Sequence, residues 1–266
     1  MTEVSTTTTT TKGLHPGLTR RQISMMGLGG AIGAGLFVGS GQAISIAGPA
    51  VLISYLVAGG IVVLIMAMLA EMVAARPSSG AFSSYAQKAM GRSAGSAVGW
   101  LYWIQLVVVI AAEATGAGGI ISAWIPGIPA WMWVLVFVVA LTAVNLFGVR
   151  NYGTFEFWFA AIKVAAIIVF LVVGVCAIVG FIPGVPATGI GNLVDNGGFA
   201  PNGLTGIAAA LLIVVFAFGG TEVVAIAAAE SDDPARNIRR IVREVLVRIL
   251  IFYVGSIFVI VSVLPW

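Results

Sequence analysis

The chain has 266 residues, of which 60% are hydrophobic and only 9% are charged. A soluble domain has about 45–50% apolar and about 25% charged residues, so the polar residues here are too few to cover a water-exposed surface. This composition excludes soluble enzymes, nucleic-acid-binding domains and secreted disulfide-rich proteins. One cysteine and one histidine also leave no residues for a zinc site, a disulfide framework or a Ser-His relay. We therefore expect a polytopic membrane protein without a cofactor or metal.

Seven apolar stretches are each long enough to cross a bilayer, which takes about 20 residues of α-helix. They predict an all-α fold, with residues 21–266 forming one membrane domain. Residues 1–20 contain six consecutive threonines and are expected to be a disordered tail. A short amphipathic helix is expected within 77–93 and an outer loop over 183–203. The predicted spans are 24–46, 49–73, 97–124, 131–149, 157–182, 204–229 and 242–264.

The basic residues indicate how the spans are oriented. Of the 13 lysines and arginines, all except Lys163 are assigned to the N-terminal tail or to the second-to-third, fourth-to-fifth and sixth-to-seventh connections; Arg243 and Arg248, near the start of the 242–264 stretch, are counted with the last of these. The alternate connections, 47–48, 125–130 and 183–203, contain no lysine or arginine. By the positive-inside rule, the N-terminus is expected in the cytoplasm and residue 266 outside. Because the basic residues are concentrated in alternate connections, the net charge of +3 does not indicate a nucleic-acid-binding surface.

The first span is interrupted by glycine. The segment GLGGAIGAGLFVGSG, residues 27–41, has seven glycines in fifteen positions, and each costs a helix about 1 kcal/mol relative to alanine. One interpretation is close packing through small residues four apart, such as Gly29 with Gly33 and Gly35 with Gly39. The other is a helix that is broken at this point.

A second interruption lies in the sixth span. The segment VFAFGGTE, residues 215–222, places two glycines and a carboxylate inside an otherwise apolar stretch. Two glycine-interrupted spans in corresponding positions are typical of inverted-repeat transporters with discontinuous helices. The amides that open a half-helix favour an anion, and the carbonyls that end one favour a cation. An amino acid carries both charges, which makes it a suitable ligand for two broken helices.

Two further charged residues lie within spans. Glu113 is in the third span and Lys163 is in the fifth, near its cytoplasmic end. Lys163 has two interpretations: its side chain extends to the inner membrane surface, or it is a fixed or titratable cation that faces the interior of the bundle.

Several segments, in order, resemble a known family. They are GLTRRQISMMGLGGAIGAGLFVGSG, AGPAVLISY, FWFAAIKV, FAFGGTEVV, AAAESDDP and RILIFYVGS. Together they resemble bacterial amino acid permeases of the amino acid–polyamine–organocation superfamily, in the branch of aromatic amino acid, GABA, proline and alanine/serine/glycine permeases. The resemblance implies a five-plus-five inverted repeat with broken first and sixth helices, proton-coupled amino acid uptake and a bacterial inner-membrane location. It also implies a chain truncated after seven spans.

The resemblance also implies roles for particular residues. In the first span, the amides of the Gly33-Ala34-Gly35 motif are expected to bind the substrate carboxylate, and the Ile32 carbonyl is expected to face the amino group. In the sixth span, the backbone carbonyls of the motif are expected to complete the ammonium site, and the Phe218 ring to gate it. Lys163 corresponds to a lysine that stands where sodium-driven relatives bind an ion, Glu222 to a carboxylate near the inner gate, and Glu113 to an acid that faces the site. The residues of the sixth-span motif are Phe216, Ala217, Phe218 and Gly219.

Three functional hypotheses remain at this stage. The first is a proton-coupled amino acid permease with an amino acid substrate, the proton as coupling ion and the lipid bilayer as its surroundings. The second is a permease fragment that inserts into the membrane and needs the missing helices or a partner. The third is a seven-helix receptor or photoreceptor, which the cytoplasmic N-terminus and the lack of a lysine in the seventh span disfavour. An enzyme is not expected, and the sequence specifies neither the amino acid nor the oligomeric state.

Overall fold

The computed structural model describes residues 32–33, 35–76, 78, 80–146, 149–221 and 245–266, and the predicted tail over 1–20 lies outside them. Over the described residues the chain is helical and contains no strand, which confirms the predicted all-α fold. The elements are η1 (Gly35–Gly39), α2 (Ser40–Ala47), η2 (Gly48–Ala50), α3 (Val51–Ala75), α4 (Ala81–Met90), α5 (Arg92–Trp124), α6 (Ala130–Leu146), α7 (Val149–Val179), η3 (Gly191–Leu193), α8 (Gly203–Ala217), η4 (Ile249–Val254) and α11 (Gly255–Val263).

Each of the seven predicted apolar stretches contains a helix. Four segments of the described chain are long and apolar enough to cross a membrane, and α6 and α8 are shorter apolar helices. A helix of 15 residues such as α8 is about 23 Å long, which is less than the hydrocarbon core of about 30 Å. The sixth span therefore does not cross the hydrocarbon core as α8 alone, because α8 stops at the predicted interruption. The four long segments are Gly35–Ala75, Arg92–Trp124, Phe157–Val179 and Val245–Val263.

Two helix starts differ from the prediction. α5 begins at Arg92 and α7 at Val149, both upstream of the expected boundaries at 97 and 157. The residues that precede the predicted spans are polar, but they include no proline that would stop a helix. The helices therefore continue beyond the apolar stretch, and hydropathy locates the membrane segment rather than the helix end.

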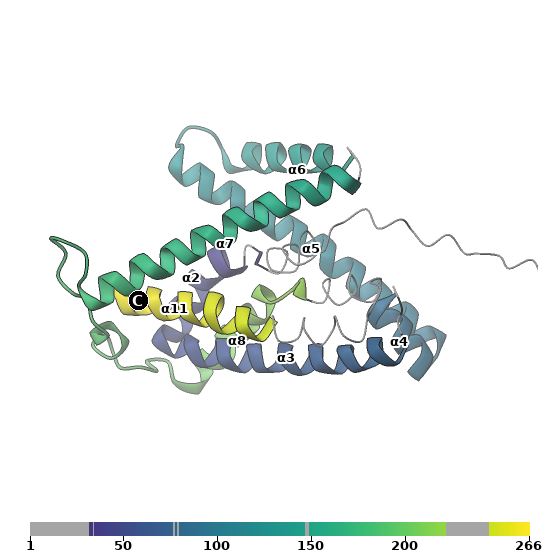
Figure 1. Cartoon of the computed structure of the whole chain (residues 1–266), viewed down its shortest axis with the longest axis horizontal. Helices are drawn as coiled ribbons and strands as arrows, with labels where there is room; N and C mark the ends of the chain where they lie inside the picture. Colours follow the sequence, from purple (N-terminus) through teal and green to yellow (C-terminus); the bar gives the residue numbers. More distant parts are fainter. Residues whose placement is uncertain (1–31, 34, 77, 79, 147–148, 222–244) are drawn as a thin grey trace, which may run out of the picture.

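The core forms where α2, α3, α8 and α11 meet. α8 packs against both α2 and α3, and α11 packs against α7; in Figure 1, α11 lies between α7 and α3. Glycines allow two of these contacts, because a Cβ at Gly59 would overlap Ile249, and a Cβ at Gly174 would overlap Val259. Small residues at helix contacts are the usual means of close packing in membranes.

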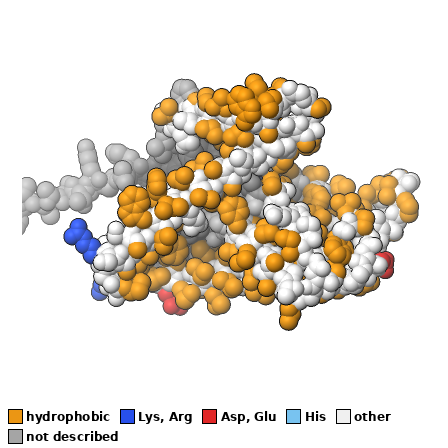
Figure 2. Space-filling view, turned by 180° about the vertical axis from the view of Figure 1, so that it is seen from behind, with side chains coloured by type: hydrophobic (Ala, Val, Ile, Leu, Met, Phe, Trp, Pro, Cys, Tyr) orange, Lys and Arg blue, Asp and Glu red, His pale blue; other side chains and the backbone are white. Residues whose placement is uncertain are grey.

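α5 and α6 form a hairpin outside this core. The buried residues of α5 are two glycines, and α6, which the structure describes in full, has none. In Figure 1 α6 lies over α7 at the edge of the molecule. The space-filling view shows apolar side chains over most of one face and few charges, which lie at its margins (Figure 2). A surface of this kind is suited to contact with lipid.

Side-chain hydrogen bonds attach the two connecting segments to the helices. In the 183–203 loop, Asn202 Nδ2 donates to the Ile46 carbonyl at 2.7 Å, and Asn192 Nδ2 donates to the Ser262 carbonyl at 2.9 Å. The predicted amphipathic helix within 77–93 is present as α4, and the Tyr85 hydroxyl donates to the Arg76 carbonyl at the end of α3, at 2.9 Å.

Candidate functional site

The first interruption lies immediately before η1. Ile32 and Gly33 have no regular secondary structure, and a π-helical turn begins at Gly35 and runs into α2. Ile32 is completely buried. Backbone that leaves the helical hydrogen-bond pattern inside a membrane is tolerated only where protein or a polar cavity covers it. The first span is thus irregular at the predicted position, over the part of it that the structure describes.

The second interruption lies at the end of α8. The helix stops at Ala217, residues 218–220 form a turn, and Thr221 returns to helix. Gly220 adopts φ +93°, a conformation that strongly favours glycine. In the turn, the Phe218 amide donates to the Val215 carbonyl at 3.2 Å and the Gly219 amide to the Phe216 carbonyl at 3.1 Å. The glycine pair in the sequence therefore marks a true end of the α-helix.

The two interruptions are in direct contact. A Cβ built on Gly35 would overlap the Ala217 backbone and lie 2.8 Å from the Ala217 Cβ. Both residues are buried. Any side chain at Gly35 would push the broken segments apart, so glycine is required here by the close approach of two backbones.

Lys163 reaches the first interruption from α7. Its side chain is half-buried, and Nζ donates a hydrogen bond to the Ile32 carbonyl at 3.1 Å. A charged group at mid-membrane costs about 2.5–3.5 kcal/mol even on lenient insertion scales, so a polar partner inside the protein is needed. This hydrogen bond favours the interior-facing interpretation of Lys163 over extension of its side chain to the membrane surface.

α5 brings two polar side chains to the same place. The Glu113 carboxylate lies against Gly33, where its Oε1 fills the space that a Cβ would occupy. Gln105, eight residues earlier on the same helix face, lies beside Gly219, with Nε2 3.9 Å from the position of a Cβ there. One face of α5 thus places a carboxylate beside the first interruption and an amide beside the second.

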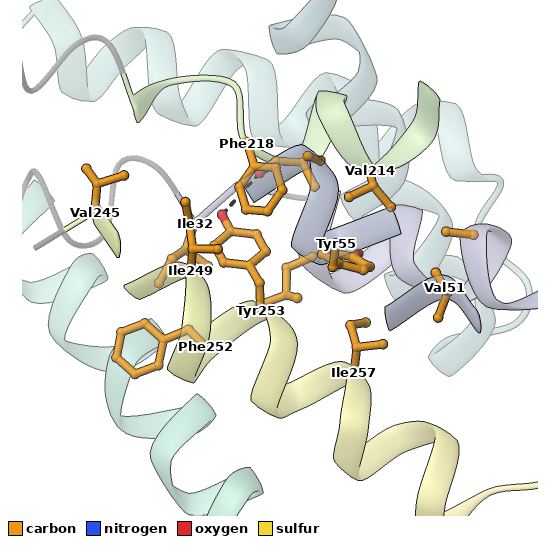
Figure 3. Close-up of a cluster of buried hydrophobic side chains, with 14 of the residues drawn as sticks. Ile32, Val51, Tyr55, Val214, Phe218, Val245, Ile249, Phe252, Tyr253 and Ile257 are labelled. Atoms are coloured by element: carbon orange, nitrogen blue, oxygen red, sulfur yellow. Dashed lines mark hydrogen bonds between the residues drawn. The ribbon is translucent and has the colours of Figure 1, made fainter. Parts of the chain in front are cut away.

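An aromatic cluster covers the second interruption. The Phe218 and Tyr253 ring centroids are 4.7 Å apart, and the Tyr55 ring lies 6.1 Å from Phe218 and 6.4 Å from Tyr253. All three side chains are buried. Figure 3 shows the three rings meeting between α3, the end of α8 and η4, with the hydroxyl of Tyr253 directed at the Ala217 carbonyl, to which it donates at 3.1 Å.

The site combines groups of both charges. Lys163 lies at the Ile32 carbonyl and Glu113 at Gly33. Carbonyls and a carboxylate suit a cation, whereas helix-opening amides and a lysine suit an anion. Groups suited to each charge therefore lie close together at the two interruptions.

Comparison with known proteins shows the family of this chain. The sequence model of the family described as amino acid permease matches residues 22–266. The chain belongs to the amino acid permease family. It is 54% identical over 255 residues to the aromatic amino acid transport protein AroP of Corynebacterium glutamicum. It is 53% identical over 253 residues to the gamma-aminobutyric acid permease of Escherichia coli, and 52% identical over 254 residues to a probable GABA permease of Pseudomonas aeruginosa.

These relatives are longer than this permease chain. The matches cover 95–96% of the chain but only 54–55% of each relative. The chain therefore spans about half the length of the curated relatives it matches. The family membership and the apolar helices together make it a multi-pass membrane protein.

The structure brings most of the predicted site residues together. Ile32, Gly33 and Gly35 meet Ala217, Phe218, Lys163 and Glu113 around the two interruptions. Phe216 is 41% exposed, with its side chain outside the buried cluster. Ala34 and Glu222 lie outside the described residues. Among the described residues, the contact between the two interruptions leaves no open space, because Gly35 and Ala217 touch and the Glu113 carboxylate fills the space beside Gly33.

One assignment from the sequence is wrong. Arg248 was assigned with the other basic residues to the sixth-to-seventh connection, but it is 3% exposed and immediately precedes η4. It lies inside the apolar segment Val245–Val263, so it belongs to the membrane-spanning helix. The positive-inside pattern counts residues near span ends as loop residues and does not distinguish a buried arginine.

Sequence reasoning also missed Tyr55, Gln105 and Tyr253. A usable signal was present for the tyrosines, because both lie well inside apolar stretches, whereas tyrosine in membrane proteins is enriched at the two interfaces. A hydroxyl at that depth needs a polar partner inside the protein. Gln105 gives the same signal, since it is an amide within the third span.

Proposed function

We propose that this chain binds an amino acid where its two interrupted spans meet and carries it across a bacterial inner membrane by alternating access, with uptake coupled to protons. The single observation that supports this most is the contact between Gly35 and Ala217. It joins the segments in which helix-opening amides and helix-ending carbonyls are free of the regular helical pattern. One polar junction inside an apolar bundle is a natural site for a zwitterion.

Within this proposal, each group has a role. The amides of residues 33–35 bind the substrate carboxylate, since the start of a half-helix favours an anion. The carbonyls of Ile32 and of residues 216–219 accept from the ammonium group. Glu113 adds negative charge on the ammonium side of the site. Phe218, buried between two tyrosine rings, gates access.

Proton coupling is assigned to Lys163, with Glu113 and Glu222 as further acidic groups on the proton route. The hydrogen bond from Lys163 Nζ to the Ile32 carbonyl at 3.1 Å supports this role, because it links a titratable cation to the backbone that contacts the substrate. Loss of the proton would remove the charge that holds this part of the first span. Protonation of Lys163 and binding of the substrate would both act on the Ile32 carbonyl, so each would change the free energy of the other, which is the requirement for coupling.

The proposed orientation has the N-terminus in the cytoplasm and the 183–203 loop outside. The uneven distribution of lysine and arginine over alternate connections supports it. We infer a transport role without an enzymatic one, since the three relatives described above are named as transport proteins or permeases. Their names include aromatic amino acids and γ-aminobutyric acid, so both are candidate substrates.

The proposal is tested by binding radiolabelled amino acids to the purified 266-residue chain in lipid nanodiscs. The panel contains phenylalanine, tyrosine, tryptophan, γ-aminobutyric acid, proline and alanine. We expect saturable binding by the natural chain and its loss in Gly35→Leu, which forces the two interruptions apart. Gly41→Leu is the matched control, because a Cβ at Gly41 meets nothing within 4 Å. Absence of binding by folded natural chain, or equal binding by Gly35→Leu, would contradict the proposal.

Binding is then compared with uptake into proteoliposomes that carry the same chain. Uptake of the bound amino acid against its gradient, driven by an inward proton gradient, is the expected result. Binding without uptake would restrict the function of this chain to substrate binding and would favour the alternative that it needs a partner polypeptide for transport.

A further inference from the structure

One carbonyl at the end of α8 accepts a hydrogen bond from a different helix. The last four carbonyls of any α-helix lack partners within that helix. Here the Phe218 amide bonds to the Val215 carbonyl and the Gly219 amide bonds to the Phe216 carbonyl. The Ala217 carbonyl accepts from a side chain 36 residues away, the hydroxyl of Tyr253, at 3.1 Å.

This hydrogen bond is shielded from its surroundings. Tyr253 has no exposed surface and Ala217 is also buried. Leaving a buried carbonyl without a donor costs about 1–3 kcal/mol, and the buried position leaves little room for water to replace the hydroxyl. Tyr253 therefore supplies a buried hydrogen bond to the second interruption in addition to the packing of its ring.

The local fold holds the hydroxyl in place. Tyr253 lies in η4, a π-helical turn over Ile249–Val254, and such turns inside α-helices are frequent at functional sites. Its ring meets Phe218, which is the residue directly after Ala217, and it also meets Tyr55. The ring is thus fixed by neighbours on the two helices that it joins to η4 (Figure 3).

The first interruption has a corresponding contact. There, Lys163 Nζ from α7 donates to the Ile32 carbonyl at 3.1 Å. At its interruption, each of the two spans therefore presents a backbone carbonyl that accepts from a side chain of another helix. Under the proposed function, the same two carbonyls belong to the set that receives the ammonium group of the substrate.

We infer that Tyr253 is a positioning residue of the substrate site: its hydroxyl holds the Ala217 carbonyl while the site is empty and gives it up to the ammonium group of an amino acid. The inference rests on the proposed function, because it takes the ligand to be an amino acid. Its consequence is a competition. The hydroxyl stabilises the empty site and thereby weakens binding, since it competes with the ammonium group for the same carbonyl oxygen.

The first test needs no ligand. Amide hydrogen exchange over residues 216–221 is compared in the purified 266-residue chain for natural sequence, Tyr253→Phe and Tyr55→Phe. Tyr253→Phe keeps the ring and removes the hydroxyl, and we expect exchange to become about two- to tenfold faster, the equivalent of one ordinary hydrogen bond. Tyr55→Phe, which removes a hydroxyl from the same cluster, is expected to leave exchange unchanged. Equal exchange in Tyr253→Phe and the natural chain would overturn the inference.

The second test measures amino acid affinity in the same nanodiscs. If the hydroxyl competes with the ammonium group, Tyr253→Phe binds about two- to tenfold more tightly than the natural chain. Mere structural damage would weaken binding, so unchanged or weaker affinity in this variant overturns the inference. Absence of binding by the natural chain would contradict the proposed function and with it the displacement step. The exchange measurement would still decide whether the hydroxyl holds the second interruption.

Discussion

The helices of the core (α2, α3, α8 and α11) and the surrounding helices α5 and α7 are both strongly apolar, yet they are buried to very different extents. The Phe157–Val179 span has a higher mean hydropathy than Val245–Val263, but 11% of its most apolar stretch is buried, against 50% for the latter. For the α5 span Arg92–Trp124 the buried share is 6%. Apolar character therefore does not determine which spans form the core.

Small and polar residues account for this difference. Lipid chains are as apolar as leucine, so apolar side chains gain little from facing protein instead of lipid. The core helices pack against each other and against α7 where glycine allows close approach, as at Gly59 and Gly174. They are also joined where buried hydroxyls bond to a neighbouring helix, as at Ser54 and Tyr253. α5 contributes Glu113 and Gln105 to the interrupted spans while most of its surface remains outside.

The largest effect is expected from the charge that α7 inserts into the core. Lys163→Met removes the cation from the Ile32 carbonyl, so uptake driven by a proton gradient is expected to fall to background, more than tenfold. Exchange of amino acid across the membrane without a gradient should persist, because the backbone site remains. The control is Lys88→Met, which removes an exposed cation on α4. Concentrative uptake by Lys163→Met equal to that of the natural chain would eliminate the coupling role.

Two leucines on α3 provide a direct test of the difference in burial. Leu69 is fully buried, whereas Leu64 is 65% exposed. Leu69→Ala is expected to lower the free energy of unfolding by about 2–5 kcal/mol, because it leaves a cavity in the core. Leu64→Ala is expected to change it by less than about 0.5 kcal/mol. Denaturant unfolding in detergent micelles measures both, and similar losses would mean that the outer face of α3 is covered by protein.

Much of the fold could be predicted from the sequence. The seven apolar stretches, the helix within 77–93 and the interruption at residues 216–219 correspond to observed elements because length, hydropathy and glycine act locally. The helix starts at Arg92 and Val149 could not be predicted in this way. A helix continues into polar sequence unless a residue stops it, and no such residue is present there.

The site could be predicted only in part. Glycine and charge inside apolar spans drew attention to Gly35, Lys163 and Glu113, because each is costly in a membrane without a specific partner. The partner of each residue lies far away in the sequence. That Gly35 meets Ala217, and that Tyr253 bonds to the Ala217 carbonyl, depends on helix packing, which glycine spacing does not specify.

Adjacent glycines on α3 give a sharper comparison, with a smaller expected effect. A Cβ at Gly59 would overlap Ile249 on η4, whereas a Cβ at Gly60 meets nothing within 4 Å. Gly59→Ala is expected to destabilise the chain by about 1–3 kcal/mol through overpacking. Gly60→Ala is expected to stabilise it by up to about 1 kcal/mol, because alanine is the better helix former. The same unfolding assay applies, and stabilisation by both variants would show that α3 and η4 separate freely.

The smallest effect is expected where a single hydroxyl joins two core helices. Ser54 Oγ on α3 donates to the Ile207 carbonyl on α8 at 2.9 Å, and Ser54 is fully buried. Hydrogen bonds between membrane helices contribute about 0.6 kcal/mol on average and up to about 1.7, so Ser54→Ala should lower the free energy of unfolding by that amount. Thr115→Ala on α5 is the control, because its hydroxyl bonds to the Ala111 carbonyl of its own helix. A loss confined to Ser54→Ala would show that polar contacts between helices, rather than hydroxyls as such, hold the core together, and equal losses would refute that view.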